Sequence, residues 1–266
     1  MPELPEVETI ARDLAAKIAG RTIENVDVRW ARSVDHRGLS ARSLHGDTIV
    51  RVHRLGKFVA LDLASGRTAT VHLRMTGRLI ADPPAPLPHT RIVMRFTDGG
   101  SLVLTDVRKF GRLRIIEGDP RTALEIGIDP FDRALTPARL AGMLRGRTTK
   151  IKTWLMDQRR LAGVGNIYAS EALFDAGIRP TRRAGRLTAV QTAALLRSLR
   201  KVMRKAIYHR GSSVDDYVDA EGMPGEFQNK LAVYGRGGLP CRRCQATIRR
   251  VVLAQRGTYF CPVCQR

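Results

Sequence analysis

The first residues of the chain place a proline beside two carboxylates, a combination that can do covalent chemistry. If Met1 is removed, Pro2 becomes a secondary amine, and α-amino groups have a pKa of about 7.7 to 8.0, far below that of lysine. Such an amine can form a Schiff base with a sugar carbon while Glu3 or Glu6 moves protons. Proline and glutamate are also favoured at a helix N-terminus, so on these residues alone a capped helix start is the simpler interpretation.

The four cysteines have the spacing of a metal site. They all lie in the last 26 residues, as Cys241-x2-Cys244-x16-Cys261-x2-Cys264. Two such pairs, separated by an insert long enough for a β-hairpin, can present four thiolates to one Zn²⁺. Redox-active cysteines are the alternative. The spacing favours one structural zinc ion, which would order a segment too small to have its own core.

A glycine-rich turn at residues 161–166 is a third candidate site. Gly163 and Gly165 would let backbone N–H groups approach a ligand at a helix N-terminus, where the helix dipole favours phosphate. The alternative is ordinary packing between two helices. The turn is surrounded by Lys150, Lys152, Arg159 and Arg160, which favours the phosphate interpretation.

The charge of the chain indicates an anionic partner. It carries 46 Lys and Arg against 25 Asp and Glu, a net charge of +21. Only 7 of these basic residues lie within the first 50 positions, so the excess begins beyond them. A basic surface on a chain with 43% hydrophobic residues is typical of a globular protein that binds a nucleic-acid backbone, although a generally basic proteome is an alternative.

No stretch of the sequence resembles a membrane span or a secretory signal. A span needs roughly 18 apolar residues, and a signal peptide has a basic region followed by an apolar one. We therefore expect a cytoplasmic protein with no membrane partner.

The elements that would position these residues follow from hydrophobic periodicity. Residues 3–19 have helical spacing, and period-two runs from 22 to 116 predict a mainly antiparallel β-sandwich. The proline-rich segment 81–89 predicts a loop between strands. Beyond about residue 117 we expect a helical domain, with helices near 137–146, 150–158, 166–176 and 188–208.

Residues 211–230 are predicted to form a long acidic loop. They include Asp215, Asp216, Asp219, Glu221 and Glu226, together with three glycines. An acidic, glycine-containing loop in a basic protein suggests a lid more than a phosphate contact. A solvated surface loop is an equally good interpretation of the composition.

Several segments together resemble the formamidopyrimidine-DNA glycosylase family, the bacterial type of 8-oxoguanine DNA glycosylase. The matching motifs are MPELPEVET at the N-terminus, GKF at 56–58, HLRMTG at 72–77, RKFG at 108–111, DQ-x4-GVGNIYASEALF at 157–174 and the four cysteines. They occur in family order and cover essentially the whole chain. Two positions depart from the family pattern: Arg210-Gly211-Ser212-Ser213 stands where Gly-Gly-Thr is usual, and Leu55 replaces a common basic residue.

The resemblance implies an α+β fold of two domains. The first is an N-terminal catalytic β-sandwich with an N-terminal helix, and the second is a helix-two-turns-helix domain with a four-cysteine zinc ribbon. The implied boundaries are 1–130 for the catalytic domain, 131–230 for the DNA-binding domain with its lesion-recognition loop, and 231–266 for the zinc finger.

The resemblance also implies a function. The chain would be a monomeric DNA glycosylase of base-excision repair that removes 8-oxoguanine and formamidopyrimidines from duplex DNA. It would then cleave the strand as an AP lyase, by β,δ-elimination. In the cell it would associate with the bacterial nucleoid.

Residue roles transfer by position. Pro2 would attack C1′, Glu3 would open the sugar, Glu6 would support the site, and Lys57 and Arg256 would assist elimination. Met75, Arg108 and Phe110 would fill the gap left by the everted base, and Arg108 would pair with the orphaned cytosine. The implied phosphate contacts are Lys57, His72, His89, Arg147, Lys152, Asn166 and Arg256.

Two other functions fit part of this pattern. An endonuclease VIII-like glycosylase for oxidised pyrimidines shares the proline chemistry and the zinc finger, but LPEVE and the Arg108-x-Phe110 pair favour the purine enzyme. A non-catalytic, damage-binding zinc-ribbon protein would need only the basic charge and the cysteines. It would leave Pro2, Glu3 and Lys57 unexplained.

Overall fold

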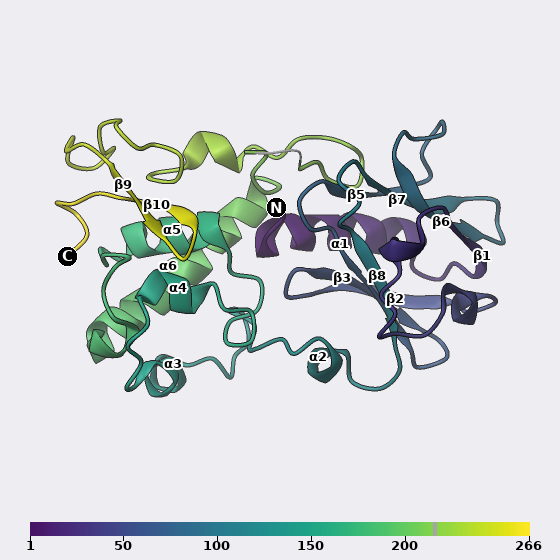
Figure 1. The fold of residues 1–266 in the computed structure, drawn as a ribbon, viewed down its shortest axis with the longest axis horizontal. Helices are drawn as coiled ribbons and strands as arrows, with labels where there is room; N and C mark the ends of the chain where they lie inside the picture. The colour runs from purple at the N-terminus through teal and green to yellow at the C-terminus, as the bar shows by residue number, and fades with distance from the viewer. Residues whose placement is uncertain (215–216) are drawn as a thin grey trace. The chain divides into compact units, whose positions relative to one another are not determined.

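The computed structural model describes residues 1–214 and 217–266, so Asp215 and Asp216 of the acidic loop lie outside the described residues. Two compact units are present (Figure 1). The first contains Met1–Glu125 and His209–Gln228, and the second contains Ile126–Tyr208 and Asn229–Arg266. The three-domain division at 130 and 230 stays a prediction. The two units differ from this division in two respects: residues 209–228, which include most of the acidic loop, belong to the first unit, and the zinc finger belongs to the helical unit.

The first unit is an antiparallel β-sandwich built around an N-terminal helix. Its sheets have the strand orders β1-β6-β7-β5 and β2-β3-β4-β8. Helix α1 (Leu4–Ile18) contacts strands of both sheets, and its apolar face is buried in their shared core. The strands are β1 Ile23–Val28, β2 Ile49–Leu55, β3 Phe58–Leu63, β4 Thr68–His72, β5 Gly77–Ala81, β6 Thr90–Phe96, β7 Ser101–Asp106 and β8 Arg112–Ile116.

Short helical turns complete this unit. They are η1 Ala31–Ser33, η2 Ala41–Leu44 and α2 Pro120–Ala123. None of the three was expected from the sequence, because each is too short to show a hydrophobic period. The proline-rich loop predicted at 81–89 is confirmed. It joins β5 to β6, which lie on either side of β7 in their sheet, whereas residues 97–100 form the turn between the neighbouring strands β6 and β7.

The second unit is helical and ends in a two-stranded hairpin. Its elements are α3 Pro137–Leu144, α4 Ile151–Leu155, α5 Asn166–Asp175, η3 Ala184–Arg186, α6 Ala189–Tyr208, β9 Arg249–Leu253 and β10 Arg256–Phe260. A further turn, η4 (Phe227–Lys230), spans the boundary between the units. The α+β fold class is confirmed. Among the described residues, no helix has both the length and the hydropathy to cross a membrane.

Side-chain caps explain where two of the helices start. Thr136 Oγ1 accepts a hydrogen bond from Arg139 N at 3.1 Å at the start of α3. Thr188 and Gln191 form a reciprocal pair at the start of α6, with side-chain-to-backbone bonds of 3.1 and 3.2 Å. Such caps satisfy backbone donors that have no partner within the helix.

Candidate functional site

The N-terminal residues form a buried cap on α1. Pro2 is buried, and Glu3 and Glu6 are only 3% and 1% exposed. Glu3 and Glu6 make a capping box, in which Glu3 N donates to Glu6 Oε2 at 2.8 Å. The capped helix start and the catalytic interpretation therefore describe the same residues. The cap fixes the backbone that leads to Pro2.

Glu6 also reaches a segment far along the chain. Its Oε1 accepts a hydrogen bond from Ser212 N at 2.8 Å. The preceding Gly211 has φ +83°, and a Cβ there would lie 2.9 Å from the Glu6 side chain. Only glycine allows this approach. Glu6 thus joins the N-terminal residues to the start of the acidic loop, within the first unit.

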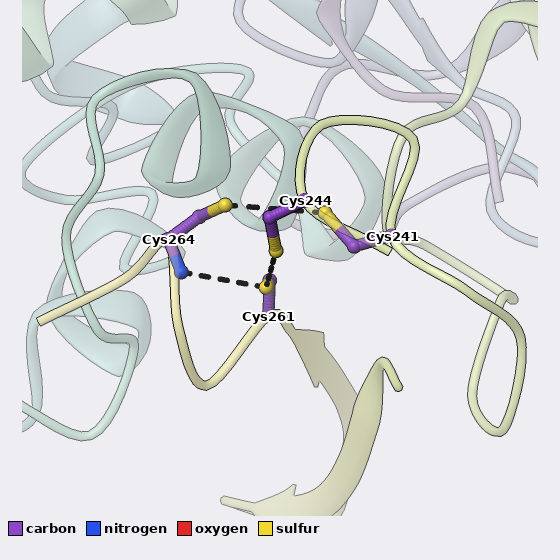
Figure 2. A group of neighbouring side chains, drawn as sticks. All are labelled: Cys241, Cys244, Cys261 and Cys264. Carbon is purple, nitrogen blue, oxygen red and sulfur yellow. Dashed lines mark hydrogen bonds between the residues drawn. The ribbon is translucent and has the colours of Figure 1, made fainter. Parts of the chain in front are cut away.

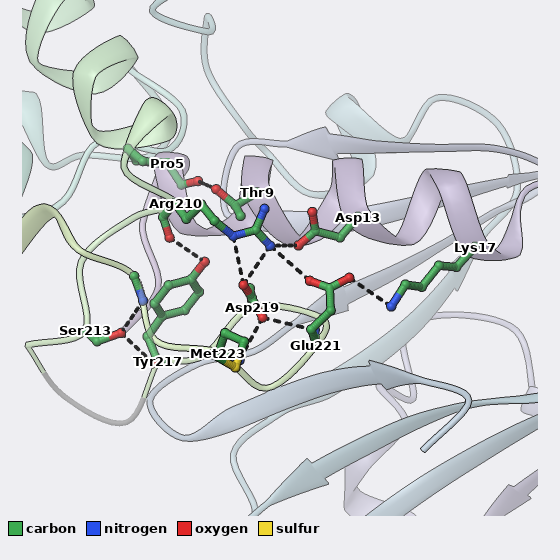
Figure 3. Close-up of polar contacts among 11 residues, drawn as sticks. Pro5, Thr9, Asp13, Lys17, Arg210, Ser213, Tyr217, Asp219, Glu221 and Met223 are labelled. Carbon is green, nitrogen blue, oxygen red and sulfur yellow. Dashed lines mark hydrogen bonds and ion pairs between the residues drawn. The ribbon is translucent and has the colours of Figure 1, made fainter. Parts of the chain in front are cut away.

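Arg210 anchors the same loop to α1 (Figure 3). Its guanidinium donates to Asp13 of α1 at 2.7 Å, and to Asp219 at 2.6 and 2.9 Å. A third carboxylate, Glu221, lies 3.0 Å from Arg210 and 2.8 Å from Lys17 of α1. The Asp219 side chain is 1% exposed, so its negative charge is buried. Loss of Arg210 would remove the cation that pairs with this buried carboxylate, which is destabilising. The loop is held against α1 by a charge network.

We expect Arg210→Gly to release this loop. Arg210 has φ +55°, a conformation that glycine adopts without strain, so the substitution leaves the backbone undisturbed while removing the guanidinium. Loss of its charged hydrogen bonds should lower the free energy of local loop opening by ~1.4 kcal/mol. Protease cleavage within 217–223 should therefore become about tenfold faster. Limited proteolysis without DNA measures this. Lys201→Ala, which removes an exposed ion pair with Asp175, is the control, and equal cleavage rates for the two variants would show that Arg210 is not the anchor.

Lys57 and His72 lie on neighbouring strand ends. Lys57 is buried in the two-residue turn between β2 and β3. Phe58 pairs with His72 across β3 and β4, and their rings are 4.7 Å apart in an edge-on arrangement. Burial lowers the pKa of His72 to about 3, with further contributions from the charges of Arg74 and Lys57, so the imidazole is neutral at neutral pH.

A buried carboxylate organises the turns that carry the predicted gap-filling residues. Asp106 accepts hydrogen bonds from the backbone N–H groups of Arg108, Phe110 and Gly111, and from Thr76 Oγ1. These bonds tie the turn after β7 to the turn before β5. Arg108 and Phe110 are exposed, and the guanidinium lies 4.9 Å from the centre of the Phe110 ring. Met75 is partly exposed in the neighbouring turn.

A cavity of about 560 Å³ lies beside these turns in the first unit. His89, Arg108 and Thr76 line it, together with Val218 and Glu221 of the acidic loop. The structure therefore brings two predicted DNA contacts next to that loop. Its floor and walls come from β5, β7 and the proline-rich segment.

In the second unit, Gln158 shapes the glycine-rich turn. Its amide donates to the carbonyls of Met156 and Val164 at 2.8 and 2.7 Å, and its Oε1 accepts from Gly163 N at 2.9 Å. Helix α4 ends before this turn, at Leu155, three residues earlier than the predicted end at 158. Asn166 is the first residue of α5, and its buried Oδ1 has no hydrogen-bond partner among the described residues. Arg147 is exposed elsewhere in this unit.

Lys152 has a different environment from the expected phosphate contact. It is 1% exposed, and its Nζ donates to Gly257 O at 3.2 Å and to Thr258 Oγ1 at 2.8 Å. It thereby fastens α4 to strand β10. Arg256, the residue before Gly257, is exposed at the start of this strand. A direct phosphate contact by Lys152 stays a prediction, and its burial does not favour it.

The four cysteines converge on one point (Figure 2). Their Sγ atoms all lie within 4.8 Å of one another, and two of the pairs are 3.4 and 4.0 Å apart. Zinc–sulfur bonds of about 2.3 Å in a tetrahedron place sulfurs about 3.8 Å apart, so the four thiolates fit a zinc ion. Backbone N–H groups of Arg243 and Cys264 also donate to these sulfurs. The site holds one structural zinc ion.

Known protein families match each part of this architecture. The formamidopyrimidine-DNA glycosylase N-terminal domain matches residues 1–113, and the H2TH domain of the same enzymes matches 126–218. The zinc finger found in FPG and IleRS matches 238–266. The chain belongs to the formamidopyrimidine-DNA glycosylase family. The resemblance noted in the sequence is thus confirmed.

Individual members of the formamidopyrimidine-DNA glycosylase family match along their whole length. The protein named Formamidopyrimidine-DNA glycosylase from Chloroflexus aggregans is 44% identical over 271 residues, covering 100% of this chain and 98% of that protein. Among solved structures, an FPG mutant of Lactococcus lactis in complex with Fapy-dG-containing DNA has a TM-score of 0.90 at 36% identity, with both chains fully covered. MutM (FPG) from Thermus thermophilus has a TM-score of 0.90 at 38% identity, with 99% of this chain and 98% of that chain covered.

The sequence analysis missed the residues that support this site. Asp106 and Gln158 each hold a turn that carries or adjoins a predicted site residue, and Arg210 holds the acidic loop. Two of them left a signal in the sequence: Gln158 lies in the DQ-x4-GVGNIYASEALF motif, and Arg210 departs from the family's usual glycine. Their supporting roles were not predicted. Asp106 and Gln158 act through hydrogen bonds to backbone groups, which sequence spacing alone does not reveal.

Proposed function

We propose that this protein is a bifunctional glycosylase and AP lyase that removes oxidised purines from duplex DNA. The observation that carries the proposal is the buried N-terminal segment of Pro2, Glu3 and Glu6 in a chain of the formamidopyrimidine-DNA glycosylase family. Glu3 and Glu6 cap α1, and Glu6 also accepts a hydrogen bond from Ser212. The FPG structures of Lactococcus lactis contain DNA with Fapy-dG or an abasic site. Damaged duplex DNA is the proposed partner of this chain as well.

The proposed reaction starts after Met1 has been removed. The nitrogen of Pro2 attacks C1′, the glycosidic bond breaks, and its electron pair leaves with the base. Glu3 protonates the ring oxygen, which opens the sugar and leaves an iminium on Pro2. Loss of a proton from C2′ then breaks the bond from C3′ to its phosphate, and a second elimination releases the 5′ phosphate. Lys57 and Arg256 assist these two steps.

Other residues hold the DNA open. Met75 and Phe110 fill the space of the everted nucleotide, and the cost of leaving the stack is a few kcal/mol. The Asp106 carboxylate supports this role, because it fixes the turns that present them. His72, His89, Arg147 and Asn166 contact phosphates, whereas Lys152 acts through the hairpin that carries Arg256. One lesion requires only a monomer, and the proposed location is the cytoplasm, on the nucleoid.

A nicking assay tests this proposal against its rivals. Duplexes carrying 8-oxoguanine, a formamidopyrimidine or an oxidised pyrimidine are incubated with the protein, and base release and strand ends are analysed. Faster release of both purine lesions, with phosphate on both sides of a one-nucleotide gap, is the expected result. Preference for the pyrimidine would favour the endonuclease VIII-like function. Tight binding with no base release would indicate a damage-binding protein.

Arg108→Ala should weaken discrimination of the base opposite the lesion. An arginine that pairs with the orphaned cytosine distinguishes it from adenine by about 1 to 3 kcal/mol, so the preference for cytosine should fall about five- to a hundredfold. Excision rates opposite cytosine and adenine measure the ratio. Arg147→Ala, an exposed arginine of the second unit, is the control. An unchanged ratio in Arg108→Ala would assign opposite-base reading to another residue.

A further inference from the structure

A basic cavity of about 450 Å³ lies in the first unit, on the face of sheet β2-β3-β4-β8 that is turned away from the core. We define it by six lining residues: Arg37, Thr70, His72, Arg74, Arg112 and Arg114. Of these, only His72 was among the predicted DNA contacts. The cavity therefore presents four guanidinium groups that the proposed mechanism does not use.

Strand register explains why these side chains share one face. His72 pairs with Arg112, and Thr70 pairs with Arg114, across β4 and β8. Residues two apart on a strand point to the same side of a sheet. The alternating residues Leu113 and Ile115 point into the core. Arg37 comes from the loop after Val34, which runs beside β8 through a bridge between Val34 and Leu113.

Three of the four guanidinium groups, those of Arg74, Arg112 and Arg114, lack a carboxylate partner among the described residues, whereas Arg37 is paired with Asp35. Arg112 Nη1 donates to the carbonyls of Lys109 and Gly111, and Arg114 Nη1 donates to Ala123 O at 2.8 Å. Within the part of the chain that the structure describes, Arg74, Arg112 and Arg114 form no ion pair, and the buried Nε of Arg114 has no hydrogen-bond partner. Backbone carbonyls orient the Arg112 and Arg114 guanidinium groups without neutralising them.

Two carboxylates also line the cavity. Asp35 is held by Arg37, through bonds of 3.0 and 2.7 Å, and Glu125 is exposed at the edge. Four guanidinium groups thus face two carboxylates, and one of the carboxylates is already paired. The excess positive charge that remains favours an anion.

His72 adds a neutral donor. Its Nδ1 accepts a hydrogen bond from Arg74 N at 3.0 Å, which assigns the proton of the neutral ring to Nε2. A fixed N–H donor beside planar guanidinium forks is suited to the oxygens of a phosphate, which arginine can bind in bidentate fashion.

We propose that this cavity binds a phosphate group, and that the usual source is a phosphodiester of the DNA outside the lesion. The inference rests on the proposed function. Strand β4 ends at His72, three residues before Met75, and the turn of Arg108 and Phe110 leads directly into Arg112 at the start of β8. The cavity is therefore continuous along the chain with the residues proposed to fill the DNA gap. We therefore expect a DNA strand that contacts those residues to place a neighbouring phosphate at this cavity.

The salt dependence of DNA binding tests the proposal. The variant Arg74→Gln/Arg112→Gln removes two charges; the Arg74 guanidinium forms no ion pair within the described residues, and glutamine at 112 can still donate to the nearby carbonyls. Each lost phosphate contact should reduce the slope of log Kd against log salt by about 1. We expect a decrease of about 1 to 2 for undamaged duplex, with at least tenfold weaker binding at low salt. Arg197→Gln, on the exposed face of α6, should leave the slope unchanged.

A second measurement separates the sources of phosphate and the two proposals. Inorganic phosphate at constant ionic strength should raise the Tm of the wild type but not of the double variant if free phosphate also enters the cavity. If the variant loses the Tm increase but keeps the salt slope of DNA binding, the cavity binds phosphate from solution and not a DNA phosphodiester. If neither the slope nor the shift changes, the cavity binds no phosphate. Borohydride trapping by the double variant, measured at saturating DNA, reports on the proposed function independently and should persist.

Discussion

Pro2→Gly should reduce single-turnover excision of 8-oxoguanine by on the order of a thousandfold, equivalent to ~4 kcal/mol of transition-state stabilisation. A secondary amine condenses only to a cationic iminium, which draws electrons at every pH, whereas the imine of a primary amine must first be protonated. Glycine also loses the ring that fixes the nitrogen at the start of α1. Excision on preformed enzyme–DNA complexes measures this effect directly.

Binding provides the control for this variant. Pro2 is buried at the helix start, and the DNA contacts proposed here lie on other elements, so affinity for lesion DNA should change by less than about threefold. Intact-mass measurement must show that Met1 is absent from both proteins, because retained methionine would place the nitrogen in an amide. Unchanged excision by a correctly processed Pro2→Gly protein would show that excision does not depend on the secondary amine of Pro2.

Cys244→Ser should remove the zinc ion and lower DNA affinity by about a hundredfold or more. The hairpin packs on a small cluster of Phe174, Val233 and Ile248 with two of the cysteines, which is too little core to hold it without the metal. Its loss releases Arg256 and the exposed arginines of the zinc finger. Metal analysis and DNA titration measure the two effects.

Cys244 is suited to this test because it is exposed, so serine opens no cavity in the core. Val252→Ser changes an exposed residue of the same hairpin and should leave both zinc and affinity unchanged. A metal-free Cys244→Ser protein with normal DNA binding would show that zinc does not support the interface.

Much of this fold could be predicted because its signals are local. Helix α1 follows from apolar spacing and its first-turn proline, and the zinc hairpin follows from two cysteine pairs. The sandwich strands follow from alternation. Each of these patterns lies within a short window, where side-chain period and turn residues decide the structure.

The remaining features depend on contacts that are distant in sequence. Arg210 and Asp13 are 197 positions apart, and the local sequence around either residue does not indicate that they pair. As a result, the sequence assigns the acidic loop to the helical domain, whereas the structure groups residues 209–228 with the first unit. For Lys152, the local sequence suggests a different partner from the observed one. A lysine beside a glycine-rich turn suggests a phosphate contact, whereas the Lys152 ammonium donates to residues more than 100 positions away in the sequence.

Borohydride trapping on DNA that carries 8-oxoguanine tests the central claim most directly. Reduction of the iminium during turnover should join one protein chain to one DNA strand, and peptide mass mapping should place the bond on residue 2, with Met1 absent. An adduct on a lysine, or efficient strand cleavage with no adduct at all, would contradict the assignment of Pro2 as the nucleophile.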